Sequence, residues 1–400
     1  MAYSLGIIGA DAAGLAAAIA AAEKTPERTI CVFERNMIPG RKLNATGNGR
    51  CNFLNRNASP ADYASGSDEA AFRKLLEAVF RTHPVSDLLD RFASIGILPA
   101  EEEDGRLYPR SFQAKSVSDA LVKAAARRGV EIRTGFSVSY INKKNNIFEI
   151  VSDTGASEEC ESVILACGGK AGIQYGCFGD GYRFAKAFGH SIVKPIPALT
   201  PLTVDGIEDI AGVRAKAKVS VYKRYPDKTE EFAAADSGEV QFTKDALSGI
   251  CTFNVSRFLR LSPDFSYVAR LDLFEEFSEE ELAALFEKRY ALFGFEKDVL
   301  SGLLPDKLVD YILEHFSCSI PELAKICKSL PFRISGSKSF KDAQVTSGGI
   351  RLEEVDPLTL ESKFVENLYF AGEVLDVDAP CGGYNLSFAF ASGVLAGENA

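Results

Sequence analysis

The stretch of sequence that decides the fold runs from Ser4 to Glu34 and reads SLGIIGADAAGLAAAIAAAEKTPERTICVFE. Apolar runs at 4–8 and 29–33 predict two short buried strands, and the run of small residues at 13–23 predicts a helix between them. Strand, helix and strand in that order form a βαβ unit, which predicts a parallel sheet in an α/β fold.

The turn after the first strand reads Gly9-Ala10-Asp11-Ala12-Ala13-Gly14. It is close to G-x-G-x-x-G, the dinucleotide-binding pattern, in which the first glycine makes the tight turn and the last lets the helix lie close to the strand. Glu34 ends the second strand, where the pattern has an acidic residue for a ribose hydroxyl. The unit therefore predicts a dinucleotide site that includes Gly9, Ala10, Asp11, Ala13, Gly14, Glu34 and Arg35.

Asp11 stands where the pattern has its middle glycine, which lets the backbone approach the pyrophosphate. Two negative charges about 4 Å apart repel by roughly 1 kcal/mol in water and by about 4 kcal/mol at an effective dielectric constant of 20. The carboxylate has no obvious cation partner in its own loop, so three outcomes are open: it points away, takes a proton, or weakens the cofactor. The alternative to cofactor binding is a dinucleotide fold that no longer binds well.

The segment 40–52 is dense in glycine, asparagine and cations. Backbone N–H groups and cationic side chains in such a loop suit phosphates and the edge of a flavin ring. An ordinary surface loop is the alternative, and the position of the segment soon after Glu34 disfavours it. The residues expected to bind cofactor here are Gly40, Arg41, Lys42, Thr46, Gly47, Asn48, Gly49, Arg50 and Cys51.

A further apolar strand is predicted at 367–371, and a closing helix at about 384–397 follows the Gly382-Gly383 pair. A helix N-terminus carries partial positive charge and free N–H groups, which would stabilise an anionic reduced flavin at its pyrimidine end. A plain turn at 382–383 is the weaker alternative. The expected site residues are Gly372, Glu373, Asp376, Gly382, Gly383, Tyr384, Asn385 and Leu386, and the segments around 138 and 166 add Val138, Ala166, Cys167 and Gly168.

These motifs resemble those of bacterial NAD(P)/FAD-dependent oxidoreductases of the aminoacetone-oxidase-like or bile-acid-reductase-like type. The matching stretches are spread over nearly the whole chain, and Gly-Arg-Cys-Asn at 49–52 and Gly-Gly-Tyr-Asn-Leu at 382–386 are the most specific. The departures are Asp11, the turn at 379–381, and Ile250 where a proline often follows Ser-Gly. The resemblance implies non-covalently bound FAD, a carboxylate at Glu373 on its ribityl chain, and a split FAD domain with an inserted β-barrel-like domain and a small helical subdomain.

The pattern along the chain leads to the same organisation, because 400 residues exceed a single core. Helices are predicted at about 68–95 and 114–128, a meander at 130–152, antiparallel strands at 190–262, and helices at 278–330 with a Ser278–Glu281 capping box and Pro321 at a first helical position. The predicted domains are a split Rossmann-like FAD-binding α/β domain of the two-dinucleotide-binding-domain type (1–190 and 346–400), an inserted antiparallel β domain (191–262 and 331–345) and a helical subdomain (263–330). We expect the insertion to cover the flavin and wall off a substrate pocket.

The composition disfavours several other classes of protein, namely those that bind nucleic acid, span a membrane or hold a metal ion. The net charge is −10 and no Lys/Arg stripe occurs, which disfavours nucleic acid as a partner. No apolar run is long enough for a membrane span, and Asp11 interrupts the apolar N-terminus. Nine cysteines without a C-x-x-C pair and three unclustered histidines indicate no metal site and reduced thiols in a cytoplasmic protein.

The expected function is that of an FAD-dependent oxidoreductase that passes electrons from NAD(P)H, through the flavin, to a small organic acceptor such as an activated C=C. NAD(P)H is expected as a transient donor, since no second nucleotide fingerprint occurs. The alternatives are a flavin oxidase of a small amine using O₂, a regulatory member that binds FAD weakly or not at all, and an RNA-modifying enzyme. Cys51 and Cys381 are interpreted as space-filling residues and His190 as a core or exposed histidine, while the catalytic acid or base, the substrate and the oligomeric state are left open.

Overall fold

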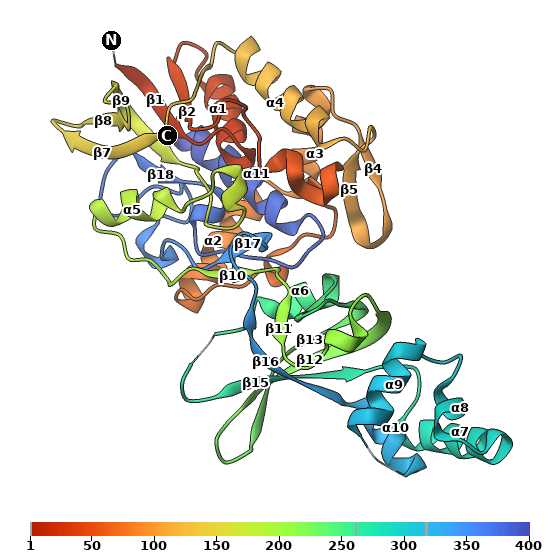
Figure 1. Cartoon of the computed structure of the whole chain (residues 1–400). Helices are drawn as coiled ribbons and strands as arrows, with labels where there is room; N and C mark the ends of the chain where they lie inside the picture. Colours follow the sequence, from red (N-terminus) through yellow and green to blue (C-terminus); the bar gives the residue numbers. More distant parts are fainter. Residues whose placement is uncertain (1, 261, 317–318) are drawn as a thin grey trace. The chain divides into compact units, whose positions relative to one another are not determined.

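The computed structural model describes residues 2–260, 262–316 and 319–400. It divides into two compact units, Met1–Ile196 with Val345–Ala400, and Pro197–Gln344 (Figure 1). The chain crosses between the units near the short strands β10 (Ile196–Ala198) and β17 (Val345–Ser347).

The first unit is built on a twisted sheet in the order β6-β2-β1-β9-β8-β7, with β18 also paired to β9. The strands β6, β2, β1, β9 and β18 run parallel, as the βαβ pattern predicts, while β7, β8 and β9 form the predicted antiparallel meander. Their bounds are β1 Tyr3–Ile8, β2 Ile30–Glu34, β6 Glu131–Thr134, β7 Val138–Lys144, β8 Ile147–Ser152, β9 Ser157–Leu165 and β18 Leu368–Phe370.

Helix α1 (Ala12–Lys24) packs against the closing helix α11 (Tyr384–Asn399). Glycines on α11 allow the backbones of the two helices to come very close together. A Cβ on Gly393 would lie 2.4 Å from the carbonyl oxygen of Ala13, and one on Gly397 would lie 2.2 Å from that of Ala17. Because both helices present small residues, the backbones approach so closely that even an alanine Cβ would not fit at these two glycines. The small-residue run in α1 is therefore a packing surface as well as part of the fingerprint.

Further helices cover this sheet: α2 Glu69–Thr82, α3 Val85–Ser94, α4 Ala114–Arg127 and α5 Asp180–Ala187. The helical stretch predicted at about 68–95 consists of two helices, because Pro84 forces His83 out of the helical region and α2 ends there. A small sheet in the order β3-β5-β4 lies beside them, with β3 Leu54–Asn55, β4 Pro99–Glu101 and β5 Arg106–Pro109.

The second unit contains a closed antiparallel barrel in the order β11-β14-β13-β12-β15-β16. Its bounds are β11 Leu202–Val204, β12 Arg214–Arg224, β13 Glu230–Phe242, β14 Ala246–Ser248, β15 Ser266–Asp272 and β16 Leu330–Ser337. Strand β12 alternates exposed Lys216 and Lys218 with buried Ala217 and Val219, so every second side chain enters the barrel core. Residues 266–272, which were assigned to the predicted helical subdomain, instead form a barrel strand.

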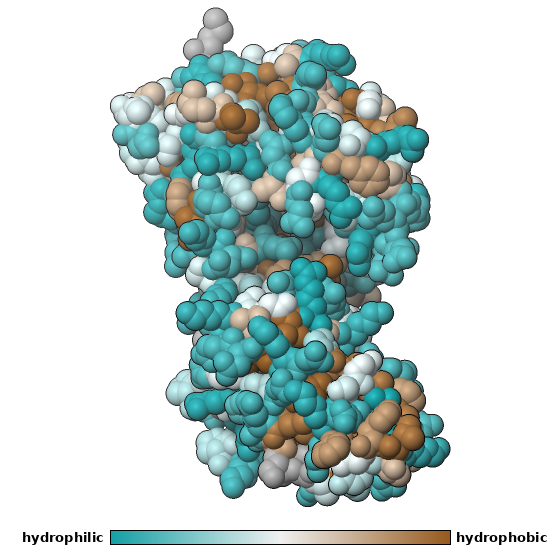
Figure 2. Space-filling view, turned by 45° about the vertical axis from the view of Figure 1, so that its right-hand side comes forward, coloured by the Kyte–Doolittle hydropathy of each residue, from teal (hydrophilic) through white to brown (hydrophobic). Residues whose placement is uncertain are grey.

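The helices of this unit are α6 Ile250–Ser256, α7 Glu279–Phe293, α8 Glu296–Leu300, α9 Asp306–His315 and α10 Ile320–Lys328. The capping box of Ser278 and Glu281 is confirmed at the start of α7. Pro321 is the second residue of α10 rather than the first, because Ser319 caps the helix in a capping box with Glu322 and the helix begins at Ile320. Figure 2 shows apolar side chains among hydrophilic ones over this unit, and Leu292 and Phe295 are among its exposed apolar residues.

Along the described ranges no helix combines the length and apolar character that a membrane crossing requires.

Candidate functional site: a dinucleotide cradle at the ends of the parallel strands

The predicted site residues from distant parts of the chain meet at one edge of the parallel sheet. Ile8 of β1 is in register with Phe33 of β2 and with Leu165 of β9, and Leu165 is in register with Phe370 of β18. Because parallel strands end at the same edge, the segments that follow them lie together there, which is where nucleotides bind in such sheets.

The fingerprint turn is held by contacts that only glycine allows. Gly9 has a positive φ of 108°, and a Cβ there would lie 2.7 Å from the carbonyl oxygen of Ala166, at the end of β9. A Cβ on Gly14 would lie 1.9 Å from the carbonyl oxygen of Gly9. These two glycines therefore fix the turn in the form that the sequence pattern predicts.

The Asp11 carboxylate is bound by backbone N–H groups, although its own loop holds no cation partner, as expected. Oδ1 accepts hydrogen bonds from the backbone N–H groups of Ala12 at 3.0 Å and Leu43 at 3.1 Å, and Oδ2 accepts one from that of Lys42 at 3.0 Å. The residue is the N-cap of α1 and ties the segment 40–43 to that helix. Burial raises the pKa of the Asp11 carboxyl to about 6, against the lowering effect of the backbone hydrogen bonds.

Glu34 lies at the predicted place at the end of β2 and is buried. Its Oε2 accepts the backbone N–H of Ala10 at 2.8 Å, and its Oε1 accepts both the backbone N–H and the side-chain amide of Asn36 at 2.7 Å. The backbone N–H of Phe136 donates to the Glu34 carbonyl, which brings the segment leading to Val138 beside this carboxylate. Glu34 is thus oriented next to the fingerprint turn.

The segment 40–52 follows the same edge, and several of its residues have left-handed backbone conformations; the N–H groups of Arg50 and Cys51 donate to the carbonyls of Gly47 and Thr46. Gly47, Asn48, Gly49 and Cys51 all have positive φ angles, between 54° and 82°. Successive residues in such conformations form concave nests that bind anions. The cations of this segment are engaged differently: Lys42 pairs with Glu373, Arg41 donates to Asn36, and Arg50 lies over the Tyr108 ring. Arg35, which follows β2, pairs with Asp180.

The C-terminal residues form the opposite wall. Lys42 Nζ lies 2.6 Å from Glu373 Oε2, and the backbone N–H of Thr346 donates to Glu373 Oε1 at 2.9 Å. Asp376 is fully buried, and its Oδ2 accepts hydrogen bonds from Ser65 and Ser67 and from the Gly66 backbone N–H. Burial raises the pKa of the Asp376 carboxyl above its ordinary value.

Helix α11 begins at this wall as predicted, after Gly382 and Gly383, which both have positive φ angles. Its N-terminus has no side-chain cap. The Asn385 side chain is bound to the preceding turn through Ala379 and Pro380, so its role is to hold that turn. The Tyr384 carbonyl accepts the hydroxyl of Tyr63, which anchors the helix start to the first unit.

The thiols in these segments are held in their protonated form. Cys51 is fully buried, and burial raises the pKa of its thiol to about 12. Burial likewise raises the pKa of Cys167 to about 12 and that of Cys177 to about 11. A thiolate nucleophile is therefore disfavoured at these positions. Within the described ranges no cluster of His, Cys, Asp and Glu could hold a metal ion.

Sequence reasoning did not find Asn36, Asn55 or Thr346, which support the site. The Thr346 hydroxyl accepts the backbone N–H groups of Lys170 and Ala171, and the Asn55 side chain donates to the Gly382 carbonyl at 2.7 Å. The position of Asn36 two residues after Glu34 was a usable signal, because a side-chain amide there can reach back to the carboxylate. Thr346 and Asn55 act across long sequence separations, which no local pattern marks.

Comparison with known proteins agrees with this architecture. A family model described as the HI0933-like protein Rossmann domain matches residues 3–399. The chain is 36% identical to the 3-dehydro-bile acid delta(4,6)-reductase of Clostridium scindens, over 99% of this chain and 98% of that protein. It is 26% and 28% identical to the ribosomal RNA dihydrouridine synthases of Haemophilus influenzae and Escherichia coli, over 96% of this chain and 95% of each relative.

The resemblance seen in the motifs is confirmed by these matches, which extend over both units. The strand order, the fingerprint turn and the inserted barrel match the predicted fold class. The chain belongs to the HI0933-like family of Rossmann-domain proteins.

Proposed function

We propose that this protein is an FAD-dependent reductase that uses NAD(P)H to reduce a C=C bond conjugated with a carbonyl group in a small apolar acceptor. The observation that carries the proposal is the meeting of the fingerprint turn, Glu34, the 40–52 nest and the start of α11 at one sheet edge. The acceptor class follows from the names of the relatives: one reduces double bonds of a bile acid, and the others form dihydrouridine, in which a conjugated C=C of uridine is reduced.

The residues present fit a flavin dinucleotide. Asn52 Oδ1 and Asp376 Oδ1 are buried and have no hydrogen-bond partner among the described residues, although buried polar atoms are nearly always satisfied. The long helix α11 presents an N-terminus without a side-chain cap. Polar atoms and helix donors of this kind suit the polar edge of a flavin and its ribityl chain.

The roles of the chain's own residues follow from their positions. Glu34 is placed to accept a ribose hydroxyl, the backbone at 47–49 to approach an anionic or carbonyl edge, and the start of α11 to stabilise negative charge at the pyrimidine end of a reduced flavin. FAD, when bound, supplies hydride transfer.

Absorbance spectroscopy tests the proposal. The purified protein, supplemented with FAD and freed of excess cofactor, should show a flavin spectrum that NADH or NADPH bleaches without oxygen. Adding a steroid with a ketone conjugated to a C=C should restore the oxidised spectrum, and the same steroid with that bond saturated is the control. Absence of bound flavin, or a bleached spectrum that only O₂ restores, would contradict the proposal. If a small amine bleaches the flavin and O₂ then restores the oxidised spectrum, the oxidase alternative is favoured.

The ribosomal RNA activity of the more distant relatives defines the second candidate. RNA is a polyanion, and the net charge of −10 disfavours its approach. Incubating the reduced protein with ribosomal RNA and measuring dihydrouridine by mass spectrometry separates the two candidates. Dihydrouridine formation with no turnover of the conjugated steroid would assign the chain to RNA.

A further inference from the structure

Asp11 has a place in the site that the dinucleotide pattern does not provide for. We propose that its carboxylate is a built-in substitute for a cofactor phosphate: it occupies the anion-binding donors of the cofactor-free protein and must release them when FAD is loaded. The inference rests on the proposed FAD binding, and it assigns to one side chain control over how readily the cofactor enters.

The donors bound by Asp11 come from the two segments expected to hold a pyrophosphate. Ala12 lies at the N-terminus of α1, while Lys42 and Leu43 follow Gly40 in the glycine- and cation-rich segment. A backbone N–H at a helix start next to a second run of N–H groups is an anion site by its geometry and partial charge. In this chain the anion is supplied by the residue that replaces the middle glycine.

The charges around Asp11 explain why the contact is stable but reversible. Lys42 is the nearest cation, although its ammonium group pairs with Glu373 at 2.6 Å. Glu34 from β2 adds a like charge, and the thiols of Cys51 and Cys177 lie close enough to interact electrostatically with the carboxylate. The carboxylate is therefore held mainly by neutral N–H donors, and a dianionic pyrophosphate would compete for those donors while being repelled by it.

This arrangement makes cofactor loading depend on pH. Because burial raises the pKa of the Asp11 carboxyl to about 6, the side chain is anionic at neutral pH and neutral in mild acid. Protonation removes the repulsion and one of the acceptors, so FAD should bind more tightly as the pH falls through that value. Glu34, Lys42 and Glu373 are the other charged groups around this carboxylate, so a variant that removes the charge at Asp11 is needed to isolate its part.

Asp11→Asn provides that change, because asparagine caps a helix about as well as aspartate and keeps the bulk. Asp68→Asn is the matched control, since Asp68 is also a helix N-cap, of α2, and accepts the Ala71 backbone N–H at 3.0 Å. FAD is titrated into each cofactor-free protein at about pH 5 and about pH 8, with flavin fluorescence as the readout. Riboflavin, which lacks the pyrophosphate, is titrated in parallel with the same readout, and ADP, which has it, by isothermal titration calorimetry.

At about pH 8 Asp11→Asn should bind FAD and ADP at least tenfold more tightly than the parent protein does. A tenfold change in affinity corresponds to about 1.4 kcal/mol of binding free energy. Near pH 5 the difference in affinity between the two proteins should fall to about twofold. Riboflavin affinity and the Asp68→Asn protein should show no such change. Asp11→Gly should also bind FAD more tightly, but should melt at a lower temperature without cofactor because the N-cap is lost.

If the variants bind FAD exactly as the parent does at both pH values, or more weakly, this inference is overturned and the proposed function stands. If neither the parent nor any variant binds FAD at either pH, the proposed function fails with it.

Discussion

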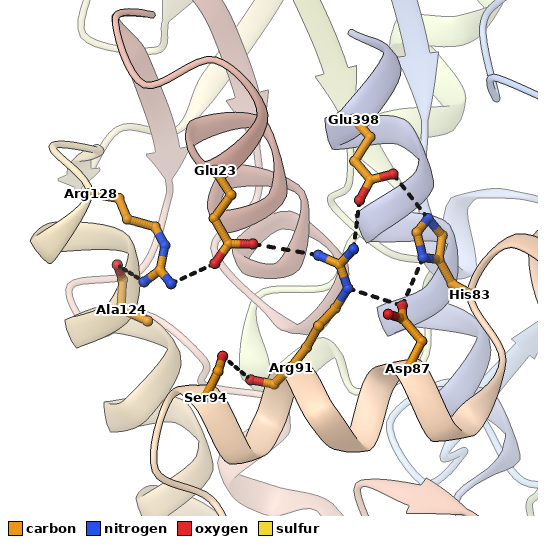
Figure 3. A network of polar contacts seen from close by, with 8 residues as sticks. All are labelled: Glu23, His83, Asp87, Arg91, Ser94, Ala124, Arg128 and Glu398. Atoms are coloured by element: carbon orange, nitrogen blue, oxygen red, sulfur yellow. Dashed lines mark hydrogen bonds and ion pairs between the residues drawn. The ribbon is translucent and has the colours of Figure 1, made fainter.

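The buried histidine His83 joins α3 to α11 in a network of charges on the first unit (Figure 3). Its side chain is 4% exposed, its Nδ1 lies 2.9 Å from Asp87 Oδ2, and its Nε2 lies 3.3 Å from Glu398 Oε2. Arg91 contacts the same two carboxylates at 3.0 and 2.7 Å and reaches Glu23 of α1 at 3.5 Å. The network therefore ties helices that are far apart in sequence across one end of α11.

Replacing His83 by glutamine should destabilise this unit by about 2 kcal/mol at about pH 6. Hydrogen bonds to charged groups contribute roughly 1.5–3 kcal/mol each, and glutamine retains one contact while losing the positive charge. The two carboxylates are 35% and 26% exposed, so water screens part of the lost attraction. For a unit of this size the loss corresponds to a fall of about 4–8 °C in the thermal midpoint.

The effect should depend on pH with a definite sign. The carboxylates raise the pKa of His83 above its ordinary value, although burial alone would lower it. A raised pKa contributes stability that is complete below the unfolded value of about 6.5 and is lost as the pH rises through the folded value. The difference in free energy of unfolding between the parent and His83→Gln should therefore be largest at about pH 6 and shrink toward about pH 9.

Urea unfolding at several pH values, followed by circular dichroism, measures this difference. His315→Gln is the control, because His315 is exposed on α9 and contacts the Tyr311 carbonyl. Burial lowers the pKa of His190, which gives the opposite pH trend, but that contribution is common to both proteins and cancels. A difference that is constant with pH, or that grows at alkaline pH, would refute the assignment of a charged His83.

Three further predictions concern the candidate site. Glu34→Ala should lower FAD occupancy at least tenfold without unfolding the chain, whereas Glu27→Ala, at an exposed position near the start of β2, should not; equal flavin spectra would show that Glu34 does not hold the ribose. Lys42→Met should lower the free energy of unfolding of the cofactor-free protein by about 1–3 kcal/mol, measured by urea unfolding, because Glu373 loses its cation. The double variant Lys42→Met with Glu373→Gln should recover part of this loss. An equal or larger loss in the double variant would show that Lys42 and Glu373 do not stabilise the protein as an ion pair. Cys51 should react with a thiol reagent only after denaturation, since it is fully buried with a pKa of about 12, and mass spectrometry of the labelled native protein would reveal the opposite.

The sequence predicted those parts of the fold that depend on local pattern. The strands of the βαβ unit, the meander and the closing helix are found where hydrophobic periodicity and glycine positions place them. The barrel was harder, because β15 and β16 lie on either side of a helical stretch and pair across it. Strand pairing over such separations depends on the partner strand, and a single sequence does not contain that information in local form.

The site shows the same division. Gly9, Gly14 and Glu34 were predicted because their spacing is set by one turn and two strands. The partners of Asp11 were not, because they are backbone N–H groups 31 and 32 positions further along the chain, and every residue except proline carries such a group. The pair of Lys42 and Glu373 spans 331 positions and required the folded sheet to be recognised.

A departure from a binding fingerprint therefore has two consequences that the pattern alone does not separate. In the cofactor-free protein, Asp11 adds an acceptor for donors that would otherwise lack one, which favours the ordered form of the segment 40–43. If a phosphate of the cofactor needs those same donors, the carboxylate must release them when the cofactor binds. The free energy that the carboxylate contributes to the ordered form then makes the binding free energy of the cofactor less favourable by the same amount. The two effects must then change together, so a substitution at Asp11 that tightens FAD while leaving the cofactor-free segment equally ordered would show that the donors are not shared.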